Sequence, residues 1–329
     1  MDVFANILEV TRLTGHAARA EFRAPWGLRV AARPEAAFVH VTRGSCVLRM
    51  RGGKDVLRLN QGDVVLVPHG VGHELGDAVD SPVADFAELM RTKAGPDGSL
   101  RHGGQGEPCA VVWGAYCFEA HAGNPFLEVL PAHVLCRADE VALDHSLGTT
   151  LQLLVAEVVG SRPGAAVVSR LLVDVLFVQL VRHWAERQPE GRVGWLFALR
   201  DERVRRALSR MHERPQHGWT VESLAREASM SRAAFARRFQ ELLGEGPHGY
   251  LTTWRMRLAA QLLRSTALSV AEVATRVGYE SEFSFSRAFR RAWDEAPARY
   301  RNLGAGRPSP QRAPSARRAV SHAAPSRRN

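Results

Sequence analysis

The sequence predicts an α+β protein with an N-terminal antiparallel β domain, a helical hairpin, and a C-terminal all-α domain that contains two helix-turn-helix units. Three observations predict it: short β-prone runs between glycine-containing turns, a later change to helical periodicity, and a repeat in the last third of the chain. At 329 residues the chain is longer than one typical hydrophobic core, so more than one domain is expected.

The β domain is predicted from residues 22 to 86, where runs rich in β-branched side chains alternate with turns. The runs are FVHV at 38–41, CVLRMR at 46–51, VLRL at 56–59 and VVLVP at 64–68. Gly44 and Gly62 fall in the turns that separate them. This spacing favours antiparallel strands.

The helical hairpin begins at about Leu147. Apolar side chains then recur on one helical stripe, at Leu147, Leu151, Leu154, Val155 and Val158. A second helix follows the Arg-Pro-Gly turn at 162–164, runs to about Gln188, and is apolar around much of its circumference. We therefore expect it to be buried against more than its hairpin partner. A homodimer interface and a bridge between domains both explain this.

The repeat pairs a segment that begins at Leu224 with one that begins at Val273. Phe235, Phe239 and Tyr250 match residues of the same type 50 positions later. Ala225 and Ala274 differ by 49, so the second copy has one extra residue in the turn after its first helix. Each copy reads as a short helix, a tight turn and a second helix, which is the helix-turn-helix pattern.

Capping and packing signals set the boundaries within each copy. Ser269 and Glu272 form a capping box, and Thr220 can cap the equivalent helix. Gly278 provides the backbone freedom that a tight turn needs. The second helices each have two phenylalanines four residues apart, which predicts a buried stripe and a free opposite face. The candidate DNA-binding residues on or beside the free faces are Ser231, Arg232, Ala233, Ala236, Arg237, Gln240, Ser281, Glu282, Phe283, Ser286 and Arg287.

Small, polar and arginine side chains on these faces suit a DNA major groove, where arginine grips guanine O6 and N7. A surface or phosphate role for Arg237 and Arg287 is the alternative. Charge supports DNA as the partner, because residues 201–329 hold 24 arginines against 12 acidic residues, whereas residues 1–200 hold 20 basic and 22 acidic residues. A solvated, arginine-rich surface is the other explanation of this asymmetry.

At residues 200–301 the chain resembles the AraC-type transcriptional regulators. The specific match is VGYxSxxxFxRxF from Val277, followed by Pro297 and Tyr300-Arg301. Asp294 and Ala296 depart from the family, which usually has Gly and then Ser or Thr there. The resemblance implies that a rigid helix at 248–265 places the two recognition helices in successive major grooves of double-stranded DNA. It also implies transcriptional activation, with RNA polymerase as a partner.

The N-terminal half resembles the cupin-type sensor domain of such regulators, on APWGLRV at 24–30, FVHVTRGSC at 38–46 and LNQGDVVLVPHGVGHEL at 59–75. This implies a small-molecule effector. Metal-binding cupins carry a His-x-His motif that this chain lacks, although His40, His69 and His73 could still meet at one effector or metal centre. We expect no cofactor and no enzymatic activity. A cupin metalloenzyme fused to a DNA-binding module remains an alternative.

The four cysteines lack a CxxC spacing, which fits reduced thiols in the cytoplasm. Cys109 and Cys117 form a redox pair only if a turn brings them together, because eight residues of straight strand span about 26 Å. A Cys-dependent DNA-repair regulator is the related alternative. The N-terminus is unlike a secretory signal, and no segment is long enough to cross a membrane.

The predicted domains follow from these signals. Residues 1–140 form the cupin-like sensor domain, and 141–199 form the helical linker or dimerisation region. Residues 200–301 form the DNA-binding domain, and 302–329 form a disordered basic tail.

Overall fold

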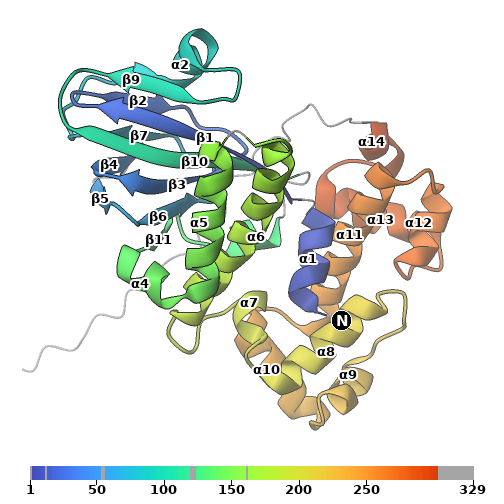
Figure 1. The fold of residues 1–329 in the computed structure, drawn as a ribbon. Helices are drawn as coiled ribbons and strands as arrows, with labels where there is room; N and C mark the ends of the chain where they lie inside the picture. The colour runs from blue at the N-terminus through green and yellow to red at the C-terminus, as the bar shows by residue number, and fades with distance from the viewer. Residues whose placement is uncertain (1, 12, 53–55, 119–123, 161, 303–329) are drawn as a thin grey trace, which may run out of the picture.

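Two sheets form the β domain in the computed structural model, which describes residues 2–11, 13–52, 56–118, 124–160 and 162–302. The first sheet has the order β11-β6-β3-β10-β1-β9 and the second the order β5-β4-β7-β2-β8 (Figure 1). The first comprises β1 (Leu13–Arg23), β3 (Ala36–Arg43), β6 (Val64–Val67), β9 (Leu100–Gly103), β10 (Pro108–Phe118) and β11 (Val134–Cys136). The second comprises β2 (Gly27–Val30), β4 (Ser45–Met50), β5 (Val56–Asn60), β7 (His73–Gly76) and β8 (Ala84–Asp85).

The predicted runs at 38–68 are strands β3 to β6, and they pair antiparallel, as expected. The longest pairing in the domain joins β1 to β10 from Leu13↔Phe118 to Arg23↔Pro108. Most of β1 lies before the predicted β region. Its sequence, LTGHAARAEFR, is rich in alanine, glycine and arginine and therefore has little intrinsic strand preference.

Apolar side chains from both sheets fill the space between them, including Phe22, Leu48, Leu59, Val65 and Val111. Helix α2 (Phe86–Lys93) closes one side of this core with Phe86 and Leu89. The other face of the first sheet packs under the helical hairpin, because alternate strand residues such as Phe38, Leu66 and Tyr116 point there.

The hairpin consists of α5 (His145–Gly160) and α6 (Ala165–Glu186), close to the predicted bounds. Helix α6 contacts α5, β1 and β11, which confirms that it is buried against more than its partner helix. Several of its apolar side chains are nevertheless exposed, at Val167, Val168, Leu171 and Val175. None of the described helices is both long and apolar enough to cross a membrane.

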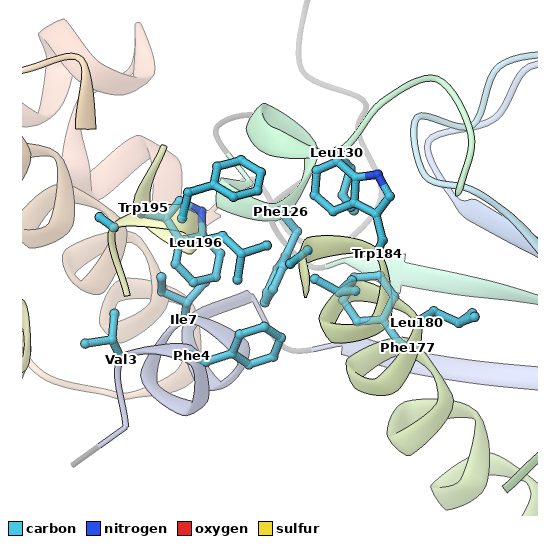
Figure 2. Close-up of a cluster of buried hydrophobic side chains, with 14 of the residues drawn as sticks. Val3, Phe4, Ile7, Phe126, Leu130, Phe177, Leu180, Trp184, Trp195 and Leu196 are labelled. Carbon is cyan, nitrogen blue, oxygen red and sulfur yellow. The ribbon is translucent and has the colours of Figure 1, made fainter. Parts of the chain in front are cut away.

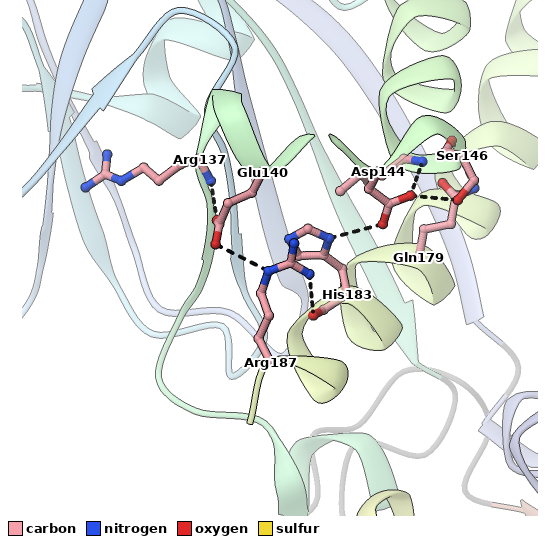
Figure 3. Close-up of polar contacts among 8 residues, drawn as sticks. Arg137, Glu140, Asp144, Ser146, Gln179, His183 and Arg187 are labelled. Atoms are coloured by element: carbon pink, nitrogen blue, oxygen red, sulfur yellow. Dashed lines mark hydrogen bonds and ion pairs between the residues drawn. The ribbon is translucent and has the colours of Figure 1, made fainter. Parts of the chain in front are cut away.

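Polar contacts fix the entry to the hairpin at α4 (Ala138–Leu143). The buried Asp63 carboxylate, from the turn before β6, accepts hydrogen bonds from the amides of Asn60 and Ala138 and from the Arg137 guanidinium, all at 2.9 Å. Figure 3 shows the contacts that continue from α4 to α6. Glu140 pairs with Arg187 at 3.3 Å, a contact that links the start of α4 to the end of α6.

The second part of this network lies at the start of α5. Asp144 accepts hydrogen bonds from the Leu147 amide and the Ser146 hydroxyl, and His183 Nδ1 lies 3.1 Å from its other oxygen. These hydrogen bonds satisfy a helix start that would otherwise leave amides unpaired. The contact with His183 also ties the start of α5 to α6.

The N-terminal helix α1 (Val3–Thr11) lies among the helices of the C-terminal third, which the sequence did not predict (Figure 1). It contacts α8 (Glu202–Glu213) and α11 (Pro247–Ser265). Its Phe4 ring lies 5.2 Å from Phe126 on α3 (Pro125–Val129) and 5.8 Å from Trp195 on α7 (Trp195–Ala198). Figure 2 shows these rings beside Phe177 of α6. Thus α1 joins the β domain and its hairpin to the C-terminal helices.

The C-terminal third also contains α9 (Val221–Glu227), α10 (Arg232–Leu243), α12 (Val270–Arg276), α13 (Glu282–Trp293) and α14 (Pro297–Asn302). Residues 303–329, almost all of the expected disordered tail, lie outside the described residues. The mixture of an antiparallel β domain with a helical C-terminal domain confirms the predicted fold class.

We predict that Phe4→Ala destabilises the junction between the sensor and the C-terminal helices by about 3–5 kcal/mol, the usual range for a buried phenylalanine. Phe4 is buried and contacts rings from two other elements. Leu143→Ala, at a side chain that is 85% exposed, is the control. Urea unfolding followed by tryptophan fluorescence measures both variants, and equal stabilities would contradict the role assigned to α1.

Candidate DNA interface and sensor cavity

The two helix-turn-helix units are α9 with α10 and α12 with α13. The Ser231 hydroxyl accepts from the Ala234 amide at 3.3 Å, and that of Ser281 from the Ser284 amide at 3.4 Å. Each serine therefore caps its recognition helix. The capping box predicted before α12 is present. The Glu272 carboxylate accepts a hydrogen bond from the Ser269 amide at 2.7 Å.

The turns of the two units share one geometry despite their different lengths. A residue with positive φ lies just after the first helix of each unit. It is Ser229 (53°) in the first unit and Gly278 (88°) in the second. The next residue donates its amide to an alanine carbonyl one turn back, Met230 to Ala225 and Tyr279 to Ala274, both at 2.9 Å. The extra residue of the second copy, Glu280, thus follows this shared turn.

Gly278 is required for a second reason. A Cβ atom at this position would lie 2.7 Å from the Cα of Gln216 and 2.8 Å from the Arg255 guanidinium. The first contact is with backbone, which cannot move aside cheaply. The close approach brings the second turn against the segment that follows α8.

The predicted phenylalanine stripes are buried in both units. Phe235, Phe239, Phe285 and Phe289 have no exposed surface. Phe239 contacts Tyr250 and Phe289 contacts Tyr300, with ring centroids 5.9 and 5.2 Å apart. The expected connector at 248–265 is α11, and its side chains enter the cores of both units.

The free faces of α10 and α13 are exposed, as the spacing of the phenylalanines predicts. Ala236 and Ser286 are half-buried, and the other candidate residues are exposed; they are Ser231, Arg232, Ala233, Arg237, Gln240, Ser281, Glu282, Phe283 and Arg287.

The two arginines that the sequence analysis places on these faces have different partners. Arg237 lies 3.8 Å from Glu241, one turn further along α10. In α13 the position that corresponds to Glu241 is occupied by Arg291. Arg287 instead places its guanidinium over the Phe283 ring, 5.8 Å from the centroid. Phe283 is 71% exposed. The sequence repeat alone did not show this difference.

Both recognition helices end on a residue in the left-handed conformation, Gly244 (φ 77°) and Asp294 (φ 57°). Asp294 thus adopts the backbone that glycine adopts in the first copy, and aspartate tolerates this region better than most residues. The departure from the family pattern leaves the helix end unchanged.

A cavity opens between the two sheets of the β domain. Its volume is about 70 Å³. Apolar and aromatic side chains dominate its lining, among them Phe22, Val39, Phe86, Val111 and Trp113. Arg33 and Glu35 add charge of both signs, and His73 adds a polar ring. A cavity with this lining suits a small, mostly apolar molecule.

The expectation that His40, His69 and His73 meet at one centre is wrong. Their rings bond to three different backbone carbonyls, those of Asp63, Leu130 and Val71, at 3.0–3.1 Å. His40 is on the face of β3 opposite to Val39 and Val41, whose side chains lie between the sheets. Among the residues that the structure describes, no group of three or more potential ligands can hold a metal ion.

His73 alone of the three lines the cavity. Burial lowers its pKa, and the nearby Arg33 charge acts in the same direction. Its Nδ1 is engaged with the Val71 carbonyl, so the neutral ring carries the proton there and presents Nε2 as an acceptor.

No turn brings Cys109 and Cys117 together, which was the condition for a redox pair within one chain. Both are on β10, which runs from Pro108 to Phe118 with no turn. Cys109 instead contacts the buried thiol of Cys46, whose pKa is raised by this neighbour and by burial. Sequence spacing could not reveal this contact, because it joins strands of different sheets.

Comparison with known proteins agrees with both halves of this architecture. A family model described as Cupin matches residues 2–186, and one described as Helix-turn-helix domain matches residues 224–303. A putative AraC-like transcription regulator of Streptomyces antibioticus is 30% identical over 302 residues, which cover 92% of this chain and 98% of that protein. The chain belongs to the AraC-like transcription regulators. A similar protein of Streptomyces lividans is 31% identical over 92% of this chain and 98% of its own length.

This AraC-like regulator is therefore a DNA-binding transcriptional regulator with a cupin sensor domain, as the sequence predicts. The activator RclR of Escherichia coli, named as RCS-specific, is 30% identical over 79% of this chain and 82% of its own length. The DNA-binding domain of AdpA, solved with a target DNA, is 38% identical over 29% of this chain and 86% of that domain, with a TM-score of 0.29.

A buried histidine on α8 of this AraC-like regulator, packed against α11, makes the stability of the protein depend on pH. His212 stacks on Trp254 at 3.8 Å and bonds to the Tyr250 hydroxyl at 2.8 Å. Burial lowers the pKa of His212 to about 3. Between its ordinary pKa and this value the unfolded chain binds the proton and the folded protein does not. The stability from neutral His212 is complete above pH 6.5 and is lost on acidification.

We predict that the free energy of unfolding falls by up to about 1.4 kcal/mol per pH unit between pH 6 and pH 4 because of this residue. His212→Gln keeps a hydrogen-bonding group and removes the titration, so its curve should be flatter by that amount. His217→Gln, at an exposed neighbour, is the control. Urea unfolding at several pH values measures the slopes; parallel curves for the wild type and His212→Gln would refute the assignment.

Proposed function

We propose that this regulator reads a bipartite DNA site, with α10 in one major groove and α13 in the next. The observation that carries the proposal is that two capped helices with exposed polar faces are joined through one continuous helix, α11. A rigid connector fixes the separation of the two faces. Successive major grooves on one side of DNA are about 34 Å apart, so the two half-sites should be one helical turn apart.

Arg237 and Arg287 are the proposed guanine readers of the two half-sites. Arginine can donate two parallel hydrogen bonds to guanine O6 and N7. Both side chains are exposed on the faces opposite the buried phenylalanines. We propose that the remaining candidate residues contact neighbouring bases and phosphates. They are Ser231, Arg232, Ala233, Ala236 and Gln240 in the first unit, and Ser281, Glu282, Phe283 and Ser286 in the second.

We predict that Arg287→Ala weakens specific binding by about 1–3 kcal/mol and relaxes base preference at one position, and that Arg237→Ala does so in the other half-site. Selection of sites from a random DNA library by the full chain and by each variant measures both effects. Arg290→Ala removes an exposed charge from the end of α13 and is the control. Uniform weakening on all sequences would identify a phosphate contact instead.

The proposed effector site is the cavity between the sheets, with His73 as its polar contact; His40 and His69 are not part of it. Its apolar lining favours an uncharged or weakly polar small molecule. A redox signal through Cys109 has less support, since this thiol contacts Cys46 in a buried position. Binding in the cavity would stabilise the sensor domain in proportion to ligand concentration.

We predict that Ala37→Phe, which places a ring in the cavity, abolishes the stabilisation given by a cavity ligand. The uncharged aromatic 1-naphthol serves as the probe, and the shift in melting temperature as the readout. Val79→Phe enlarges an exposed side chain away from the cavity lining and is the control. If 1-naphthol shifts wild type and Ala37→Phe equally, the cavity is not where it binds.

We further propose that the regulator acts as a homodimer through the hairpin. Val167, Leu171 and Val175 recur every fourth residue on α6 and are 45–55% exposed, so they form an unpartnered apolar stripe. Leu153 and Val159 of α5 add exposed apolar surface on the other helix of the hairpin. The region proposed for this role is residues 141–199, between the sensor domain at 1–140 and the DNA-binding domain at 200–301.

We predict that Leu171→Glu shifts the protein from dimer to monomer at micromolar concentration, because two charges would be buried in a symmetric contact. Leu143→Glu makes the same change at an exposed leucine outside the stripe. Sedimentation velocity of both variants and wild type is the measurement. A wild-type monomer, or a Leu171→Glu dimer, would contradict the proposal.

The regulator is proposed to activate transcription by contacting RNA polymerase, in the cytoplasm and without enzymatic activity of its own. Its similarity to a protein named as a transcriptional activator supports this direction. Reporter expression from a promoter with the selected site distinguishes activation from repression.

A further inference from the structure

The recognition face of α13 carries an aromatic side chain that the fold does not need. Phe283 is 71% exposed, whereas the core of this unit is filled by Phe285 and Phe289. The first unit has Ala233 at the matching position and forms the same turn and helix. A large apolar group held in water near the start of a recognition helix has no packing role in the described protein.

Arg287 places its guanidinium over this ring. Its guanidinium carbon lies 5.8 Å from the ring centroid, within cation–π range. In the first unit, Glu241 lies one turn further along the helix, and its carboxylate attracts the guanidinium of Arg237. The corresponding residue of α13 is Arg291, so no carboxylate at this position draws the Arg287 guanidinium away from the ring. The ring therefore holds the guanidinium near the start of α13, the end of a recognition helix that contacts base edges.

We propose that Phe283 and Arg287 act together and read a T·A pair next to a G·C pair. This inference rests on the proposed DNA-reading role of α13. Arg287 would donate to O6 and N7 of the guanine, and Phe283 would contact the C5 methyl group of the adjacent thymine. Both are matches between side-chain chemistry and the base edges exposed in the major groove. Neighbouring base pairs are about 3.4 Å apart, so two side chains in contact with each other can reach adjacent pairs.

The test removes single groups from the DNA. A site is first selected with the full chain, and the half-site read by α13 is the one whose preference changes in Arg287→Ala. Each thymine in that half-site is then replaced by deoxyuridine, which lacks only the methyl group. Affinities are measured by fluorescence anisotropy at one salt concentration.

One replacement, beside the guanine that Arg287→Ala no longer selects, should weaken wild-type binding about fourfold, the value expected for one buried methyl-sized group. Phe283→Ala should lose that sensitivity, and Phe283→Leu should keep part of it. The exposed position of Phe283 makes these variants compatible with folding, which a melting curve checks. Replacing the guanine by 7-deazaguanine should weaken wild type and leave Arg287→Ala unchanged.

Two results would overturn the inference while leaving the proposed function intact. One is a selected half-site with no thymine beside the guanine. The other is a deoxyuridine effect of equal size in wild type and Phe283→Ala, because another residue would then contact the methyl group. Selection that yields no preferred sequence at all would instead refute the proposed function.

Discussion

The aromatic contact of Phe4 with Phe126 and Trp195 holds the parts of the protein together. Phe126 continues this contact to Phe177 of α6, with ring centroids 5.3 Å apart. As a result, one hydrophobic core runs from the outer face of the first sheet, through the hairpin and α1, into the first helix-turn-helix unit. Domains joined by a short linker usually move against each other unless a large apolar interface prevents it. Here the interface is part of the core itself.

The second unit is coupled to this core through α11. Leu251 and Trp254 at the start of α11 belong to the shared core, whereas Met256 and Leu263 belong to the separate core of the second unit. A helix that is closely packed on both sides transmits a displacement, because the core around it has little free volume to absorb the movement. Any change in the sensor that shifts α1 would therefore act first on α8 and α11, the helices that α1 contacts, and through them on α10 and α13. Polar contacts reinforce this junction, including the 2.6 Å ion pair between Arg257 and Glu128.

The parts that the sequence predicted are those fixed by local signals. The caps at Ser231 and Ser269, the glycine turn at Gly278 and the paired phenylalanines are recognisable within a dozen residues. Helix α1 was not predicted, because only contacts with residues more than a hundred positions away give it a partner. The arrangement of the histidines and cysteines could not be predicted for the same reason: the way the two sheets pack together decides that His40 points away from the cavity and that Cys109 meets Cys46.

The two recognition helices then differ through one residue on the solvent side. In α10 the residue four positions after Arg237 is Glu241, whose carboxylate lies 3.8 Å from the Arg237 Nε atom. An exposed pair of this kind is worth at most about 1 kcal/mol, but it also places a negative charge toward the phosphates. In α13 the corresponding residue is Arg291, and the arginine rests on an uncharged ring. Binding by α13 therefore requires no loss of an ion pair and adds positive charge at the same place. We therefore expect the second unit to contribute more of the specificity and the first unit, which shares the core of the sensor side, to set its position.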